Sequence, residues 1–468
     1  MFVGREQELA DLERQLRLVR EGGRLGRGAA VAIRGRRRVG KSALAAEFIK
    51  RSGLPSVYFQ AARGAPIAQE LASLIEAIKA SDMPEAERVQ GLTTDSFSSA
   101  LRVLADALPD DGPSIVVLDE LPWLLESVPG GAGELQRAWD QHLSSKPVLL
   151  MLLGSDLSMM EALDRHDQPF YGRSTPMTLR ELSVRDVATL IGQTGFDAFD
   201  AHLVTGGQPL LLSEWTSGMS TRDFVEASLS TPTSALVTSG TRLLDGEFPD
   251  VSLARPILRA IGGRGERAFT HIRSAAGISQ VALERGLSLL IEKRVIAVDE
   301  PLSTARAAKD RRWRIADPAL RFWLTFVEPA LDEVDRRRGD LAFGRWSRGF
   351  AAWRGRAIEP VVREALVSIA SREGFPGLDR IGGWWPRSNN PEIDLVGADA
   401  APANKIAFVG TIKWRPDTPI TADEVGMLAR GALHVPGVDA GTPLVAVCPA
   451  GSNGDSRLQQ VWTAEDLI

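Results

Sequence analysis

The stretch AAVAIRGRRRVGKS occupies residues 29–42 and decides the fold. Its first part, Ala29 to Ile33, is a short apolar run typical of a buried strand. Gly35 to Ser42 then fits the pattern G-x-x-x-x-G-K-[ST], in which a glycine-rich loop and the N-terminus of the next helix surround a phosphate group with backbone N–H groups. This order of strand, loop and helix predicts a P-loop nucleotide site.

The loop residues have separate tasks. Gly35 and Gly40 let the backbone curl around the phosphates. Lys41 reaches the β- and γ-phosphates, and the Ser42 hydroxyl ligates Mg²⁺, so we expect ATP and Mg²⁺ as cofactors. The residues expected to line the nucleotide are Gly35, Arg36, Arg37, Arg38, Val39, Gly40, Lys41, Ser42 and Ala43. The arginines could add phosphate affinity or could be solvated, and a glycine turn with an incidental lysine is the structural alternative to the site.

Two further apolar runs supply the rest of an ATP-hydrolysing site. Ser114 to Leu118, expected to form a strand beside the P-loop strand, ends in Asp119 and Glu120. Asp119 can hold Mg²⁺ through water and Glu120 can polarise the attacking water, whereas the alternative is an acidic pair that only closes a strand. Val148 to Leu153 leads to Ser155, which we expect to sense the γ-phosphate or, alternatively, to cap a helix.

The order of elements predicts an α/β protein of several domains. Strands alternate with helices at first, which indicates a doubly wound parallel sheet and a P-loop ATPase core at 1–180. Short helices predict a helical lid at 181–250. Helices followed by a two-stranded hairpin predict a winged helix at 251–330, and the last part, 331–468, reads as a small α/β unit.

Finer boundaries follow from the same patterns. The hairpin strands are expected at 295–298 and 312–315, and the charged stretch 332–340 is expected to be a linker. In the last unit the pattern predicts a helix at 356–370 and strands at 392–396, 406–414 and 444–447.

Composition excludes several classes of protein. The 468 residues are 44% hydrophobic and 25% charged, as in ordinary globular proteins, so disorder is not the dominant state. The net charge of −5 restricts any nucleic-acid site to a local patch. The single cysteine, Cys448, excludes an intramolecular disulfide and a cysteine-based zinc site. No signal peptide and no apolar run near the roughly 20 residues of a membrane span is present, so we expect a cytoplasmic protein without a membrane partner.

Taken in order, the motifs resemble those of prokaryotic AAA-like ATPases of the STAND class, in particular the archaeal-type ATPase family. Besides the P-loop, the similar segments are Phe2–Glu6, Leu118–Leu124, Leu153–Met160, Phe170–Arg173, Gly206–Pro209 and Asp317–Trp323. The resemblance implies that Val3 and Arg5 lie near the adenine and that Pro209 lies close to the base. It also implies that Arg173 acts on the nucleotide, either in cis or from a neighbouring subunit.

Such ATPases often carry a C-terminal domain that resembles PD-(D/E)XK restriction endonucleases. The resemblance assigns Glu359 to an early helix, Asp394 to a divalent metal and Lys413 to the attacking water. Thr411 stands where the pattern has a second acid, which should lower metal affinity. Glu392 could compensate in part, because it shares a strand face with Asp394. A plain ion pair between Asp394 and Lys413 is the alternative.

The winged-helix pattern points only weakly to DNA contact. Its second long helix, 279–293, carries both signs of charge, whereas a DNA-reading helix usually has a one-sided basic stripe. Phosphate contacts could come from Arg264, Arg267, Arg273, Arg311, Arg312 and Arg314. Trp384 and Trp385 could stack on bases or pack in a core. The five histidines show no metal-ligand spacing.

These features predict an ATP-driven switch that controls a C-terminal domain interacting with nucleic acid, namely DNA. The family resemblance implies a role in defence against foreign DNA. Two alternatives stay open. One is a non-catalytic scaffold in which slow ATP turnover governs self-association or a protein partner, and the other is a transcription regulator that acts through the winged helix.

Overall fold

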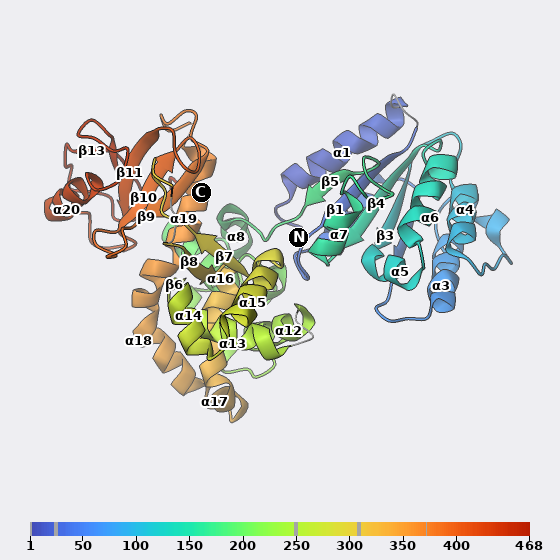
Figure 1. Cartoon of the computed structure of the whole chain (residues 1–468). Coiled ribbons are helices and arrows are strands. Elements are labelled where there is room, and N and C mark those ends of the chain that lie inside the picture. The colour runs from blue at the N-terminus through green and yellow to red at the C-terminus, as the bar shows by residue number, and fades with distance from the viewer. Residues whose placement is uncertain (1, 23–26, 248–250, 307–309, 371) are drawn as a thin grey trace. The chain divides into compact units, whose positions relative to one another are not determined.

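The computed structural model describes residues 2–22, 27–247, 251–306, 310–370 and 372–468. The chain divides into two compact units, Met1–Glu181 (unit 1) and Leu182–Ile468 (unit 2). In Figure 1, unit 1 runs from blue to green and unit 2 from green to red. Within the described residues, no helix combines the length and the apolar character that crossing a membrane requires.

Unit 1 is a parallel sheet with helices on both faces (Figure 1), which confirms the predicted α/β P-loop fold. Its strands, in the order β2-β3-β4-β1-β5, are β1 (Ala29–Arg34), β2 (Ser56–Gln60), β3 (Ser114–Asp119), β4 (Val148–Gly154) and β5 (Thr175–Thr178). Its helices are α1 (Glu6–Glu21), α2 (Lys41–Ser52), α3 (Ile67–Lys79), α4 (Phe97–Ala107), α5 (Leu121–Ser127), α6 (Gly131–Ala138) and α7 (Leu157–Leu163).

Side chains of β1 alternate between two hydrophobic cores. Val31 and Ile33 pack with α1 and α2 on one face, and Ala30 and Ala32 pack with α3, α4 and α6 on the other. Because both faces of the sheet are covered, its central strands consist of almost continuous apolar residues.

One expectation about this sheet is wrong. The strand that ends in Asp119 does not lie beside the P-loop strand, because β4 pairs with both and separates them. Parallel pairing is set by helical crossovers between distant segments, which a local apolar run does not reveal. Asp119 still reaches the P-loop, because the carboxyl ends of parallel strands share one edge of the sheet.

Unit 2 begins with helices and a small antiparallel sheet of order β6-β8-β7. Its first helices are α8 (Val184–Ile191), α9 (Gly195–Thr205), α10 (Pro209–Leu212), α11 (Thr221–Leu229) and α12 (Ala235–Glu247). There follow α13 (Val251–Ile261), β6 (Arg267–Ala268), α14 (Phe269–Ala276), α15 (Gln280–Glu292), β7 (Ile296–Asp299), β8 (Arg312–Ile315) and α16 (Pro318–Phe322).

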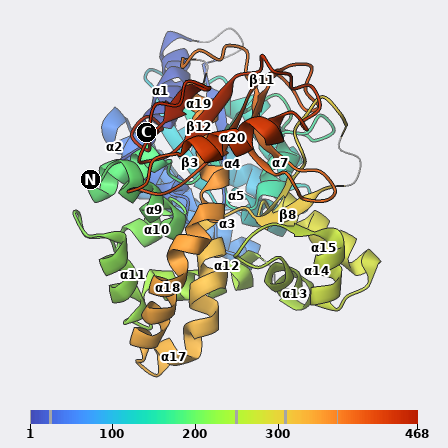
Figure 2. The ribbon, with the colours of Figure 1, turned by 90° about the vertical axis from the view of Figure 1, so that its left-hand side faces the viewer.

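The expected linker at 332–340 is also wrong. It is occupied by α17 (Leu331–Asp335) and the start of α18 (Gly339–Ala357), where Val334 and Gly339 are buried. Charged residues lie on the exposed sides of these helices, so their density does not indicate a free segment. Figures 1 and 2 both show α18 extending from the C-terminal sheet to α17. The single helix expected at 356–370 is the end of α18 followed by α19 (Glu359–Ile369).

The C-terminal sheet is mixed and has the order β13-β12-β11-β10-β9. Its elements are β9 (Arg380–Trp384), β10 (Ile393–Ala398), β11 (Ile406–Ile412), α20 (Ala422–Ala432), β12 (Leu444–Val447) and β13 (Leu458–Trp462). The first three strands pair antiparallel and the last three parallel. α19 packs on one face through Val362 and Leu366, and α20 packs on the other through Leu428 and Ala432.

Unit 2 shares one hydrophobic core along its length. Residues from α8, α15, α16, α18 and the C-terminal strands all belong to it. The indole N–H groups of Trp323 and Trp353 donate to the carbonyl oxygens of Val237 and Gly263, at 3.0 and 2.7 Å, and so connect distant helices. Because close-packed interiors transmit strain, a displacement in one part of this core changes the packing of the rest.

Candidate functional site

The P-loop turns tightly after β1. A Cβ atom on Gly35 would lie 2.5 Å from the carbonyl oxygen of Leu179, and Gly40 has a φ of 100°, so both positions require glycine. Lys41 is buried, and its Nζ donates to the carbonyl oxygens of Gly35 and Arg36 at 2.8 and 3.1 Å. The loop therefore holds the lysine ammonium group where phosphates are expected.

Asp119 is the centre of a hydrogen-bond network beside the loop. Its Oδ2 accepts hydrogen bonds from the hydroxyl groups of Ser42 and Tyr58, both at 2.7 Å. Its Oδ1 accepts one from the backbone N–H of Glu120 at 2.9 Å. Burial and the neighbouring carboxylate of Asp119 raise the pKa of Tyr58 well above its usual range, so the phenol keeps its proton and donates. The sequence prediction paired Ser42 with Asp119 but missed Tyr58.

Ser155 lies against Glu120. Its hydroxyl donates to Glu120 Oε2 at 2.7 Å, and its backbone N–H reaches the same oxygen at 3.4 Å. Glu120 has a φ of 52°, in the left-handed region that residues other than glycine seldom adopt. The alternative for Ser155, a helix cap, is wrong: Asp156 caps α7 by accepting from the backbone N–H of Met159 at 3.0 Å.

The N-terminal segment reaches the P-loop from the other side. Arg5 is buried, and its guanidinium donates to the carbonyl oxygen of Val39 at 3.0 Å. Val3 lies two residues earlier in the same segment. The contact places Arg5 beside the P-loop, and the expected approach of Val3 and Arg5 to the adenine stays a prediction.

Two arginines flank one tryptophan near the loop. The guanidinium carbons of Arg37 and Arg63 lie 5.9 and 4.8 Å from the ring centroid of Trp123. Arg36 forms an ion pair with Glu181 at 3.7 Å, and Arg38 has a φ of 66°. Trp123 belongs to the family-like segment Leu118–Leu124, but no motif contains Arg63, so this contact was not expected from the sequence.

Arg173 is engaged in an ion pair. Its Nε and Nη2 donate to the two carboxylate oxygens of Asp140, each at 2.8 Å, and Nη1 donates to the carbonyl oxygen of Pro169 at 2.9 Å. This bidentate contact lowers the pKa of Asp140. An action of Arg173 on the nucleotide stays a prediction and would require this pair to open.

In unit 2, two of the family-like motifs meet. Gln208 donates to Asp317 Oδ2 at 3.0 Å, and Asp317 caps α16 by accepting from the backbone N–H of Leu320. Gly207 has a φ of 66° and approaches the carbonyl oxygen of Leu182 so closely that a Cβ atom would clash at 2.0 Å. Pro209 opens α10 directly after this turn. The expected approach of Pro209 to the base stays a prediction.

The side chains at the P-loop have the chemistry that binding of Mg²⁺ and ATP requires. Mg²⁺ prefers hard oxygen ligands and usually keeps several waters, so the Ser42 hydroxyl can ligate it directly and the Asp119 carboxylate can hold its water. When bound, the metal would neutralise charge that develops on the phosphates. Lys41 would hold the β- and γ-phosphates, and Glu120 would take a proton from the attacking water.

The candidate acid of the C-terminal sheet already has hydrogen-bond donors. Asp394 Oδ2 accepts from the Thr411 hydroxyl at 2.7 Å and from the backbone N–H of Ile412 at 2.9 Å. The alternative of a plain ion pair between Asp394 and Lys413 is wrong, because no such pair is present among the described residues. Lys413 follows β11 on the same strand face as Thr411.

One arginine, Arg363, bonds to both Glu359 and Asp394. Arg363 donates to Glu359 Oε2 at 3.0 Å and to the carbonyl oxygen of Asp394 at 2.9 Å. Burial, together with the charge of Asp394, outweighs Arg363 and raises the pKa of Glu359 to about 7. In the described residues, no group of three or more His, Cys, Asp or Glu side chains is arranged to hold a metal ion.

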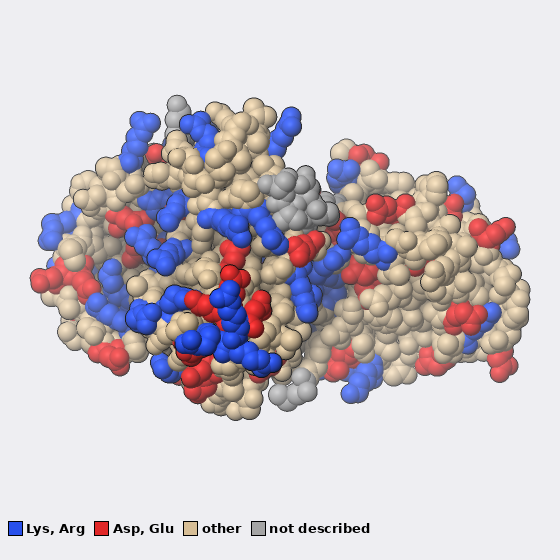
Figure 3. Space-filling view, turned by 90° about the horizontal axis from the view of Figure 1, so that it is seen from below, with Lys and Arg blue, Asp and Glu red and all other residues tan. Residues whose placement is uncertain are grey.

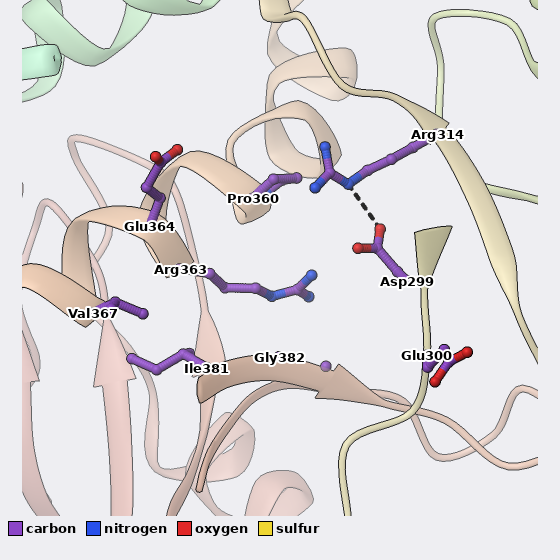
Figure 4. Close-up of a pocket in the computed structure, with 10 residues that line it drawn as sticks. Asp299, Glu300, Arg314, Pro360, Arg363, Glu364, Val367, Ile381 and Gly382 are labelled. Atoms are coloured by element: carbon purple, nitrogen blue, oxygen red, sulfur yellow. Dashed lines mark hydrogen bonds and ion pairs between the residues drawn. The ribbon is translucent and has the colours of Figure 1, made fainter. Parts of the chain in front are cut away.

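A pocket of about 240 Å³ opens between the small antiparallel sheet and α19. Figure 4 shows Arg314 and Arg363 pointing into it from opposite sides, with Arg314 bonded to Asp299 at 2.8 Å. The polar lining is thus largely satisfied by pairs within the protein, and we assign no ligand to it.

Arg312 joins the small sheet to the C-terminal domain. It forms ion pairs with Glu392 at 2.5 Å and with Glu266 at 3.2 Å, and donates to Asn389 at 2.8 Å. Its guanidinium carbon lies 4.0 Å from the ring centroid of Trp385. Trp384 and Trp385 are 7% and 4% exposed, so neither is open to a base in this arrangement, and Glu392 is already paired.

The exposed surface of α15 is neither basic nor fully polar. Val281, Leu289 and Ile291 are 58%, 41% and 40% exposed, among side chains of both charges. Figure 3 shows positive and negative side chains interspersed over the face turned to the viewer, without one continuous basic surface over unit 2 on the left. This distribution does not favour α15 as a DNA-reading helix.

Two family models match parts of the chain. Residues 1–151 match a model described as an AAA ATPase domain. Residues 323–425 match a model described as Archaea bacterial proteins of unknown function. The N-terminal part of the chain is therefore similar to AAA ATPase domains, and a second, different family model matches the part that begins at residue 323.

Three similar proteins share low sequence identity with this chain. An uncharacterized protein of Methanocaldococcus jannaschii is 24% identical over 426 residues, which make up 89% of this chain and 88% of that protein. The Walker-type ATPase of Pyrococcus abyssi is 19% identical, with 69% of this chain and 96% of that chain covered and a TM-score of 0.48. The ORC2 protein of Aeropyrum pernix is 14% identical, with 74% and 95% covered and a TM-score of 0.46.

Proposed function

We propose that this chain is an ATP-hydrolysing switch of the STAND type that controls nucleic-acid binding by a nuclease-like C-terminal domain which has lost cleavage. The observation that carries the proposal is the site at the carboxyl edge of β1, β3 and β4. There Lys41, Ser42, Asp119 and Glu120 lie together, which supports roles in phosphate binding, metal binding and water activation.

The nuclease-like assignment rests on the order of three residues. Glu359 lies in a helix, Asp394 on β10, and Lys413 directly after the neighbouring strand β11, which is the order that the resemblance implies. Loss of cleavage is supported by Thr411. Its hydroxyl donates to one of the two carboxylate oxygens of Asp394, and a hydroxyl group is a poor substitute for a second acid.

We propose a winged helix at 251–330 as the connecting part. The order α13, β6, α14, α15, β7, β8 and the three-stranded antiparallel sheet support it. Arg312 of β8 bonds to Glu392 and Asn389 of the C-terminal domain, so a shift of this sheet would be transmitted directly. The mixed surface of α15 favours such a relay over a transcription regulator that reads DNA through this helix.

A cleavage and binding assay on the full chain tests the proposal. Supercoiled, linear and single-stranded DNA and RNA are incubated with Mg²⁺ or Mn²⁺, with and without ATP. Lys413→Ala is the test variant, and Lys405→Ala, at an exposed position before β11, is the matched control. We expect binding without cutting, and weaker binding by Lys413→Ala alone.

Two results would contradict parts of the proposal. Cutting that disappears in Lys413→Ala would establish an active nuclease and show that Thr411 is tolerated. Neither binding nor cutting would favour a scaffold that acts through self-association or a protein partner. A role in defence against foreign DNA, which the family resemblance implies, requires the DNA binding that this assay measures.

A further inference from the structure

We propose that Tyr58 is a positioning residue for Mg²⁺ binding, which acts by fixing the carboxylate of Asp119. The inference rests on the proposed ATP-hydrolysing function, and it deepens that function by adding a residue that the P-loop pattern does not contain.

The register of the sheet brings Tyr58 to Asp119. β2 pairs with β3 so that Tyr58 lies opposite Val117 and Gln60 opposite Asp119. Side chains alternate along a strand, so Tyr58, Val117 and Asp119 share the face that α2 covers. The ring of Tyr58 packs against the core on this face, and its hydroxyl extends to Asp119 Oδ2 at 2.7 Å.

The bond has a consequence for metal binding. A carboxylate offers about four acceptor positions, and three of those on Asp119 are filled by Ser42, Tyr58 and the Glu120 backbone N–H. The remaining acceptor on Oδ1 is free to hold a metal-bound water. When Ser42 turns its oxygen to the metal, Tyr58 is the side-chain donor that keeps Oδ2, and with it the whole carboxylate, from rotating.

Packing alone does not account for a tyrosine here. Phenylalanine would fill the same space in the core, whereas the added hydroxyl donates to Asp119 at 2.7 Å and also lies within hydrogen-bond reach of the Ser42 hydroxyl. The chain has two tyrosines, and the ring of the other, Tyr171, is 51% exposed. Tyr171→Phe therefore removes the same atom at a surface position and is a matched control.

Equilibrium binding of the fluorescent analogue MANT-ATP to the full chain tests the inference without relying on turnover. Nucleotide affinity is measured in EDTA, and Mg²⁺ is then titrated to find the concentration of half-saturation. For Tyr58→Phe we expect unchanged affinity in EDTA and a rise of about tenfold in the half-saturating Mg²⁺ concentration, as loss of a hydrogen bond to a charged group implies. Tyr171→Phe should match the wild type.

A double-mutant cycle separates positioning from general stability. If Tyr58 acts through Asp119, Tyr58→Phe should change Mg²⁺ binding less than about twofold once Asp119→Asn is present. Additive effects, an unchanged Mg²⁺ requirement in Tyr58→Phe, or an equal loss of affinity in EDTA would overturn the inference while leaving ATP hydrolysis intact. A wild-type chain that neither binds nor hydrolyses ATP would overturn the proposed function, and the inference with it.

Discussion

The hydroxyl group of Ser155 donates a 2.7 Å hydrogen bond to Oε2 of Glu120 across the carboxyl edge of the sheet in unit 1. Ser155 follows β4 and Glu120 follows β3, and these strands are neighbours. Ser155 is 4% exposed, so the bond is shielded from water. It connects the candidate base for water activation to the residue expected to sense the γ-phosphate.

Ser155→Ala should slow hydrolysis without weakening nucleotide binding. The variant leaves Glu120 without its hydroxyl donor, so the carboxylate loses its fixed position near the attacking water. We expect kcat to fall about tenfold, with the affinity for ATP within about twofold of the wild type. Steady-state ATPase kinetics and MANT-ATP binding measure both quantities. If the affinity for ATP falls as much as kcat does, Ser155 acts by holding the nucleotide and not by fixing the carboxylate of Glu120.

Lys41→Ala should abolish ATP hydrolysis. Lys41 Nζ donates to two carbonyl oxygens of the loop, where phosphates are expected. We expect hydrolysis to fall by about a hundredfold or more, because a fixed positive donor to the phosphates is lost. Phosphate release from purified protein measures this effect. Turnover at the wild-type rate would contradict the P-loop assignment.

Gly35→Ala should damage the nucleotide site through the backbone. The added Cβ atom would lie 2.5 Å from the Leu179 carbonyl oxygen, so the loop must shift away from β5. We expect at least about a tenfold loss of ATP affinity. Gly133→Ala in α6, where nothing lies within 4 Å of the new atom, is the matched control and should bind ATP normally. Equal affinity in the two variants would show that the close approach at Gly35 is not needed.

Asp200→Asn should change how the stability of unit 2 depends on pH. Burial outweighs the 2.7 Å ion pair with Arg354 and raises the pKa of Asp200 to about 6. Between about pH 4 and pH 6, the folded protein thus keeps a proton that the unfolded chain releases, and stability from this group falls as pH rises. Above pH 6 the loss in the free energy of unfolding that this group causes is constant, at up to about 3 kcal/mol.

The check is a comparison of unfolding midpoints at pH 4.5, 5.5 and 6.5. Asp200→Asn should lose less stability across this range than the wild type does. Asp197→Asn, at an exposed position on the same helix, removes only the smaller of the two influences that raise the pKa of Asp200 and should shift the profile far less than Asp200→Asn does. Parallel profiles for all three proteins would mean that Asp200 titrates as an ordinary exposed carboxyl.

Thr411→Glu should restore a metal site in the C-terminal sheet. The new carboxylate would lie beside Asp394, at a position that is 6% exposed, and the two negative charges would repel. We expect a lower unfolding midpoint without metal, and recovery together with measurable heat of binding when Mn²⁺ or Mg²⁺ is added. Calorimetry without binding would argue against the nuclease-like register of Asp394 and Lys413.

The sequence predicted the parts of the site that lie within one local pattern. The P-loop, Asp119 with Glu120, and Ser155 each follow an apolar strand, and their types and spacing indicate their chemistry. Because parallel strands end at one edge, these residues come together even though the expected strand order was wrong by one strand.

Contacts between distant segments could not be predicted in this way. Tyr58 reaches Asp119 only through the pairing of β2 with β3, and Arg312 reaches Glu392 across 80 residues. Nothing local to either residue indicates its partner. Likewise, the charges of residues 332–340 conceal the helix α17 and the start of α18, with three arginines at 336–338 between them.

The most direct test of the central claim is the DNA affinity of Glu120→Gln in two nucleotide states. This variant should bind ATP and stall before hydrolysis, so that the ATP-bound state can be compared with the nucleotide-free state by fluorescence anisotropy on the full chain. We expect the two affinities to differ at least about fivefold, with the DNA left intact. Equal DNA affinity in both states would contradict the claim that ATP controls the C-terminal domain.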